Sequence, residues 1–107
     1  LVATGEVRRG SLGLEARDLD ARVAADLGLP ADARGALVTQ VYPGSAAAAA
    51  GLRAGDVVVA ANGERVDSYA TLRNFEGLQP VGSRVALDVR RDGRPLQLTA
   101  TLREAPR

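Results

Sequence analysis

The sequence contains no cysteine and no histidine, and each absence excludes a kind of chemistry. Without cysteine no disulfide can form, and a histidine–cysteine zinc site is impossible. Without histidine the chain lacks the usual general base and the commonest metal ligand, so a histidine-dependent catalytic triad is excluded within these 107 residues. The sequence therefore predicts a non-catalytic domain with no catalytic residues, no metal site and no cofactor.

Aromatic residues and excess charge are also scarce. Two tyrosines and one phenylalanine make up 3% of the chain, so its core must consist mainly of leucine, valine and alanine. The 14 basic residues, all arginine, are spread along the chain and nearly balanced by 13 acidic ones. Nucleic-acid binding needs a concentrated basic patch, and no segment has the apolar length of a membrane span. We therefore expect neither a nucleic-acid partner nor membrane insertion.

The segment from Pro43 to Val66 carries the most specific local pattern. Pro43-Gly44 predicts a turn, and Ser45 is suited to cap the N-terminus of a helix. Ala46–Ala50 would continue that helix, and Gly51 can take the left-handed conformation that ends it. Turn, cap, helix and stop follow one another without intervening residues.

A strand and a hairpin follow in the same segment. Val57–Ala61 has no polar face, as expected of a strand covered on both sides. Asn62-Gly63 then predicts a two-residue type I′ turn. Asp56 lies just before this strand without a partner acid, base or metal ligand, so we interpret it as a turn-capping residue and not a catalytic one.

The remaining pattern predicts short alternating elements. Asp20 would cap a helix that Gly28 ends, and a third helix would run from about Ser68 to Glu76, ended by Gly77. Strands are predicted at Leu14–Asp18, Ala36–Tyr42, Arg84–Arg90 and Leu96–Arg103, the last two joined by the turn Asp92-Gly93. We therefore expect a mainly β fold with short helices (α+β), arranged as a small antiparallel β-sandwich or partly open barrel.

Two motifs resemble a known family. Leu12-Gly13-Leu14 resembles the carboxylate-binding loop of PDZ domains, and the arginine-glycine start at Arg9 resembles that of the first PDZ domain in HtrA/Deg-type bacterial serine proteases. The segment from Pro43 to Val66 resembles the core of bacterial PDZ domains, and the likeness extends from about Glu6 to Leu102. It implies a PDZ-like fold with the bacterial permuted strand order over residues 6–103, between linkers at 1–5 and 104–107.

The resemblance also implies a peptide-binding groove. Backbone N–H groups of Leu12, Gly13 and Leu14 would converge on a peptide's terminal carboxylate, and the next strand would pair with the peptide. PDZ domains are an established case of such strand addition, and the helix positions spaced i, i+4 and i+7 would face the peptide. The candidate peptide-binding residues are Arg9, Gly10, Ser11, Leu12, Gly13, Leu14, Glu15, Tyr69, Leu72, Arg73 and Glu76.

Several of these residues have a structural alternative. Gly10 and Gly13 could merely shape a turn, Leu72 is more readily a core residue, and Arg73 with Glu76 could form a solvated ion pair. Family pockets are usually apolar near the position of Glu76, so this chain departs from the pattern there. That departure bears on the expected preference for a small hydrophobic terminal residue.

Two functions follow from the resemblance. The first is a non-catalytic domain that captures hydrophobic C-termini or extended segments of unfolded proteins for a linked serine protease. The alternative is a structural or regulatory domain that mediates subunit contacts in the protease oligomer. The expected partners are peptides or unfolded protein segments, the parent protease domain and other subunits, and the implied location is the periplasm or cell envelope.

Overall fold

The computed structural model describes residues 10–30 and 33–104. Its helices are α1 (Ala21–Asp26), α2 (Ala46–Ala50) and α3 (Tyr69–Gly77). Its strands are β1 (Gly10–Ser11), β2 (Leu14–Asp18), β3 (Ala36–Val41), β4 (Val57–Ala61), β5 (Glu64–Arg65), β6 (Arg84–Arg91), β7 (Arg94–Thr101) and β8 (Arg103–Glu104). Within the described ranges, no helix is long and apolar enough to cross a membrane.

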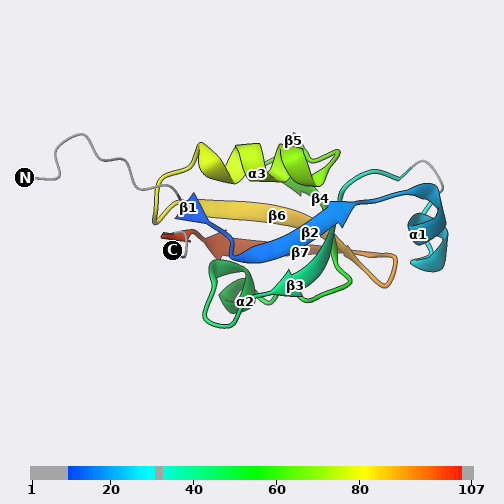
Figure 1. The fold of residues 1–107 in the computed structure, drawn as a ribbon, viewed down its shortest axis with the longest axis horizontal. Helices are drawn as coiled ribbons and strands as arrows, with labels where there is room; N and C mark the ends of the chain where they lie inside the picture. The colour runs from blue at the N-terminus through cyan, green and yellow to red at the C-terminus, as the bar shows by residue number, and fades with distance from the viewer. Residues whose placement is uncertain (1–9, 31–32, 105–107) are drawn as a thin grey trace, which may run out of the picture.

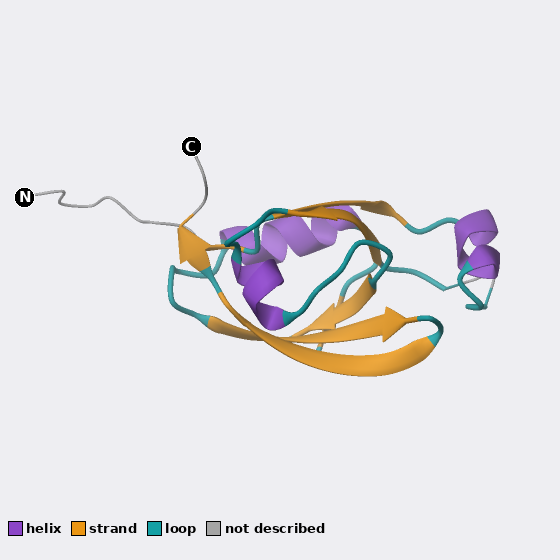
Figure 2. Ribbon diagram, turned by 90° about the horizontal axis from the view of Figure 1, so that it is seen from below, coloured by secondary structure: helices purple, strands orange, loops and turns teal. Residues whose placement is uncertain are grey.

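The main sheet is antiparallel and open. Its strands follow the order β2-β3-β4-β6-β7, with β5 paired to β4, while β1 and β8 form a separate short pair. Helices α2 and α3 lie on opposite sides of the strands in Figure 1, and α1 lies apart at one end. Figure 2 shows the strands curving around the two central helices. The predicted mainly β, partly open architecture is confirmed.

The core is built from the apolar face of each strand. Val85, Leu87 and Val89 alternate along β6 and are buried, as their spacing predicts. In β4, Val57 and Val58 are completely buried, which agrees with a strand covered on both sides. Because aromatic residues are scarce, aliphatic side chains such as these valines and leucines fill the interior.

The predicted caps and turns are present. The Ser45 hydroxyl accepts a hydrogen bond from the Ala48 N–H, and Gly51 ends α2 with a left-handed φ of 94°. Asp20 caps α1 in the same way, through the Val23 N–H. The two predicted hairpin turns join β4 to β5 and β6 to β7, with positive φ at Asn62, Gly63, Asp92 and Gly93.

Helix α3 ends one residue later than the sequence predicts. Gly77 is the last helical residue of α3 and does not take a left-handed conformation, whereas Leu78 is the C-cap. The helix ends through tight bonds from the Leu78 N–H to the Phe75 carbonyl and from the next N–H to the Glu76 carbonyl, which need no left-handed residue. At the C-terminal boundary, Glu104 still pairs with β1. Apart from Glu104, the proposed linkers at 1–5 and 104–107 lie outside the described residues.

Among the described residues, Asp56 is the charged residue that is buried, with 2% of its surface exposed. Its carboxylate accepts a hydrogen bond from the Arg53 N–H at 2.9 Å, which confirms the predicted turn-capping role. It also accepts two bonds from the Arg91 guanidinium, at 2.9 and 2.7 Å, and Arg91 donates another to the Gly51 carbonyl. One ion pair thus links the end of α2, the start of β4 and the end of β6.

Candidate functional site

Strand β2 lies at the edge of the main sheet. It pairs with β3 along one side, and among the described strands nothing pairs with its other side. Helix α3 lies against both β1 and β2. An extended peptide could therefore enter between β2 and α3 and continue the sheet, because the outer backbone groups of an edge strand seek hydrogen-bonding partners.

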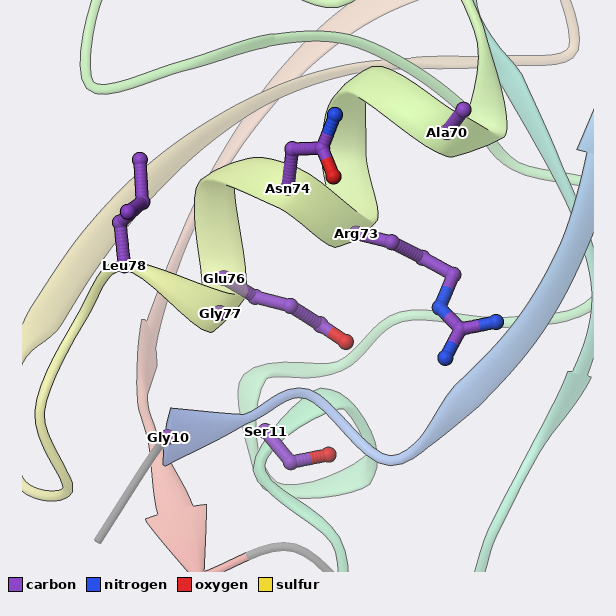
Figure 3. A pocket seen from close by; sticks show the side chains of 8 residues that line it. All are labelled: Gly10, Ser11, Ala70, Arg73, Asn74, Glu76, Gly77 and Leu78. Atoms are coloured by element: carbon purple, nitrogen blue, oxygen red, sulfur yellow. The ribbon is translucent and has the colours of Figure 1, made fainter. Parts of the chain in front are cut away.

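A cavity of about 830 Å³ opens between β1 and α3. Four of the predicted site residues line it: Gly10, Ser11, Arg73 and Glu76. Figure 3 shows the Arg73 and Glu76 side chains extending from the helix toward the chain segment that carries Ser11. The structure therefore brings together the loop and the helix that the sequence assigned to one site.

The sequence prediction missed four other lining residues: Ala70, Asn74, Gly77 and Leu78. Three of them repeat at intervals of three or four along α3, which is the spacing of one helix face. That periodicity was a usable signal, but the prediction followed the spacing from Tyr69 instead. Leu78, just past the helix, is one of the exposed large apolar residues of the described structure.

Two of the three loop N–H groups predicted to receive a peptide carboxylate already have partners. The Leu12 N–H donates a hydrogen bond to Oε2 of Glu76 at 3.2 Å. The Gly13 N–H donates one to the Ser11 hydroxyl oxygen at 3.1 Å. The carboxylate that meets this loop is therefore the domain's own, from a residue 64 positions away in the sequence.

The Glu76 carboxyl group is held in an environment that disfavours its charge. Burial raises the pKa of Glu76 above its ordinary value, although the Leu12 N–H and the Arg73 charge act in the opposite direction. Arg73 makes no close ion pair with Glu76 in the described structure. Its guanidinium lies 5.7 Å from the centre of the Tyr69 ring, so the alternative of an Arg73–Glu76 ion pair is wrong.

Three predicted site leucines lie in the core and do not line the cavity. Leu12 and Leu72 are almost completely inaccessible, and Leu14 is 8% exposed. The core position was the favoured alternative for Leu72, and it is confirmed. A core with so few aromatic residues needs leucine side chains to fill its volume, which explains why these three point inward.

The other predicted residues have mixed positions. Tyr69 is half-buried against the core, and the Arg73 guanidinium lies over its ring. Glu15 is exposed on β2, and its carboxylate accepts a hydrogen bond from the Tyr42 hydroxyl. Arg9 lies outside the described residues. Neither Tyr69 nor Glu15 lines the cavity.

The two loop glycines have packing requirements. A Cβ atom at Gly10 would lie 2.7 Å from the Leu102 side chain, and the Gly10 N–H donates to the Gln79 carbonyl. At Gly13 φ is +73°, and a Cβ atom would lie only 2.3 Å from Cβ of Ser45. Both glycines therefore shape the loop that borders the cavity, whether or not a ligand is bound.

An open antiparallel sheet whose edge strand is unpaired among the described strands, beside a helix and a lined cavity, is the arrangement of domains that can bind extended peptides by strand addition. The sequence comparison agrees with this class, since residues 37–91 match the model of the PDZ domain family. The chain belongs to the PDZ family.

Curated relatives cover nearly the whole chain. It is 40% identical over 105 residues to the periplasmic serine endoprotease DegP of Escherichia coli K12, covering 98% of this chain and 22% of that protein. It is 38% identical over 102 residues to the periplasmic pH-dependent serine endoprotease DegQ of the same strain, covering 95% and 22%. The chain thus spans about a fifth of the length of these relatives.

A solved structure supports the same relationship. The HtrA-type protease AlgW, solved with a decapeptide, matches with a TM-score of 0.85 and 31% identity over 97% of this chain and 32% of that one. The resemblance to the PDZ region of HtrA-type proteases is confirmed. The periplasmic location that the resemblance implied agrees with the names of the curated relatives.

Proposed function

We propose that this PDZ domain binds extended hydrophobic segments of unfolded proteins by adding them to β2, on behalf of a linked periplasmic serine protease. The observation that carries this proposal is the side of β2 that no described strand pairs with, beside the cavity between β1 and α3. The relatives named as periplasmic serine endoproteases and the AlgW structure with a decapeptide support it.

The proposed binding mode separates affinity from selectivity. Main-chain hydrogen bonds to β2 would fix the peptide without reading its sequence, and side chains on alternate positions would face α3. A linked catalytic domain would then meet the captured segment at an effective concentration of about a millimolar, as expected for a short flexible linker. Even weak capture would therefore accelerate cleavage.

Peptide titration followed by backbone amide NMR tests the site. A short apolar peptide should bind with a dissociation constant of roughly micromolar to tens of micromolar, shifting the amides of Ser11 to Arg17. The internal control is β7, the strand at the opposite end of the same sheet. Shifts confined to β7, or none at all, would contradict peptide capture at β2 and favour subunit contact as the main role.

A second prediction concerns catalysis. The purified domain should leave unfolded casein intact, because the chain lacks histidine and cysteine and its candidate site presents no nucleophile paired with a base. Gel electrophoresis after prolonged incubation measures this directly. A serine-protease inhibitor distinguishes contaminating protease, and inhibitor-resistant cleavage by the domain would overturn the non-catalytic assignment.

A further inference from the structure

Glu76 reaches the loop where a bound peptide would end. Its Oε2 atom accepts the Leu12 N–H at 3.2 Å, and its side chain lines the cavity beside Ser11. Figure 3 shows the Glu76 carboxylate directed toward the loop segment and away from the outer helix face, where Asn74 points. The Leu12 N–H follows Ser11, which lines the cavity, and a loop N–H of this kind can donate to a carboxylate; here the protein supplies that carboxylate itself.

A peptide's terminal carboxylate would meet this negative charge at close range. To reach the Leu12 N–H it must either displace Glu76 or lie beside it, and two like charges in a partly buried site repel strongly. A segment whose chain continues, or whose terminus is amidated, carries no such charge. It could pair with β2 while the bond between Glu76 and Leu12 stays in place.

We propose that Glu76 acts as an internal carboxylate ligand of the loop and so selects against peptides with a free C-terminal carboxylate, in favour of internal segments. The inference rests on the proposed peptide-binding function and names the kind of segment that this groove prefers. It also revises the expectation from the sequence that the loop captures a terminal carboxylate, because the loop N–H of Leu12 is occupied.

The charged side chains around Glu76 do not offset the repulsion between its carboxylate and a peptide's terminal carboxylate. On α3 the nearby ionisable side chains are Arg73, whose guanidinium lies over Tyr69, and Tyr69 itself. β1 and β3, which also pack against α3, carry no ionisable side chain. β2 carries three, each engaged elsewhere: Glu15 with Tyr42, Arg17 with Asp20, and Asp18 with the Tyr69 N–H.

The test compares one apolar peptide ending in Val-Leu, prepared as the free acid and as the C-terminal amide, by isothermal titration at pH 7.5. Wild-type domain should bind the amide more tightly than the free acid, because the charge of Glu76 at the Leu12 N–H repels the terminal carboxylate. Glu76→Gln keeps the size and the oxygen acceptor but removes the charge, and should bind the free acid about tenfold more tightly than the wild type does, with the amide nearly unchanged. The matched control Glu64→Gln removes the same charge from an exposed position on β5 and should change neither.

A pH titration of the wild type gives a second readout that needs no variant. Because burial raises the pKa of Glu76, the carboxyl is neutralised at a higher pH than a peptide terminus, whose pKa is about 3.5. Free-acid binding should therefore strengthen from pH 7.5 to 5, whereas amide binding should not. In Glu76→Gln the affinities of the free acid and of the amide should show the same dependence on pH from 7.5 to 5.

The outcomes separate the two proposals. If wild-type domain already prefers the free acid by tenfold or more, and Glu76→Gln leaves that preference unchanged, Glu76 is not a competitor and the inference is wrong, while peptide binding stands. If free-acid binding by the wild type is independent of pH over this range, the inference is likewise overturned. If neither peptide binds to the wild type, the proposed function fails and the inference fails with it.

Discussion

Replacing Asp56 by alanine should lower the free energy of unfolding by about 3–5 kcal/mol, the usual cost of breaking a buried ion pair on one side. The carboxylate is almost completely buried and accepts bonds from the Arg53 N–H and the Arg91 guanidinium. Its removal leaves that N–H and a half-buried arginine without their partner. Urea denaturation monitored by circular dichroism measures the loss.

Asp67→Ala is the matched control for this prediction. Asp67 also pairs with an arginine, Arg65, but both side chains are more than half exposed, so the loss should be at most about 1 kcal/mol. Equal losses for Asp56→Ala and Asp67→Ala would show that burial adds nothing to the pair between Asp56 and Arg91. Arg91→Ala should also be costly, since it leaves the buried Asp56 charge unpaired.

Replacing Gly13 by alanine should cost about 3 kcal/mol of stability, because two penalties combine at this position. The backbone has φ of +73°, which disfavours any side chain, and the new Cβ atom would lie 2.3 Å from Cβ of Ser45. Ser45 caps α2, so the helix start must move to make room. Chemical denaturation of Gly13→Ala and of the wild type measures the total loss in free energy of unfolding.

Gly44→Ala isolates the conformational part of that cost. Gly44 has a nearly identical φ of +75°, but no atom lies within 4 Å of its added Cβ, so this variant should lose only about 1–2 kcal/mol. The difference between the losses in free energy of unfolding of Gly13→Ala and Gly44→Ala measures the energetic cost of the steric clash between the loop and the start of α2. Equal losses would mean that the start of α2 yields freely and that Gly13 is needed only for its backbone conformation.

The elements that sequence analysis predicted well are those specified by neighbouring residues. Ser45 with Gly51 delimits α2, and the dipeptides Asn62-Gly63 and Asp92-Gly93 place two hairpins, because each signal acts within one turn. Strand alternation likewise assigns the buried face of β6. The loop and α3 were assigned to the candidate site through the resemblance to PDZ domains, which the short motif Leu12-Gly13-Leu14 carries.

The contacts that sequence analysis missed join residues far apart in the chain. Asp56 and Arg91 are separated by 35 positions, and nothing local distinguishes Arg91 among the 14 arginines. The bond between Leu12 and Glu76 spans 64 positions and depends on how closely α3 packs against the loop. Helical spacing correctly directed Glu76 toward the groove, but the partner of its carboxylate follows only from the tertiary arrangement.

The side of β2 that pairs with no strand in the described structure has a further consequence for the behaviour of the domain in solution. Exposed strand edges promote uncontrolled sheet growth between molecules, and proteins counter this with short, charged edge strands. β2 is five residues long, and Glu15, Arg17 and Asp18 keep charged side chains exposed along it. An apolar peptide brings no charge to this edge, whereas a second β2 would bring three more charged side chains that lose part of their hydration when the strands pair. We therefore expect β2 to remain available for peptide binding at high protein concentration without promoting self-association of the domain.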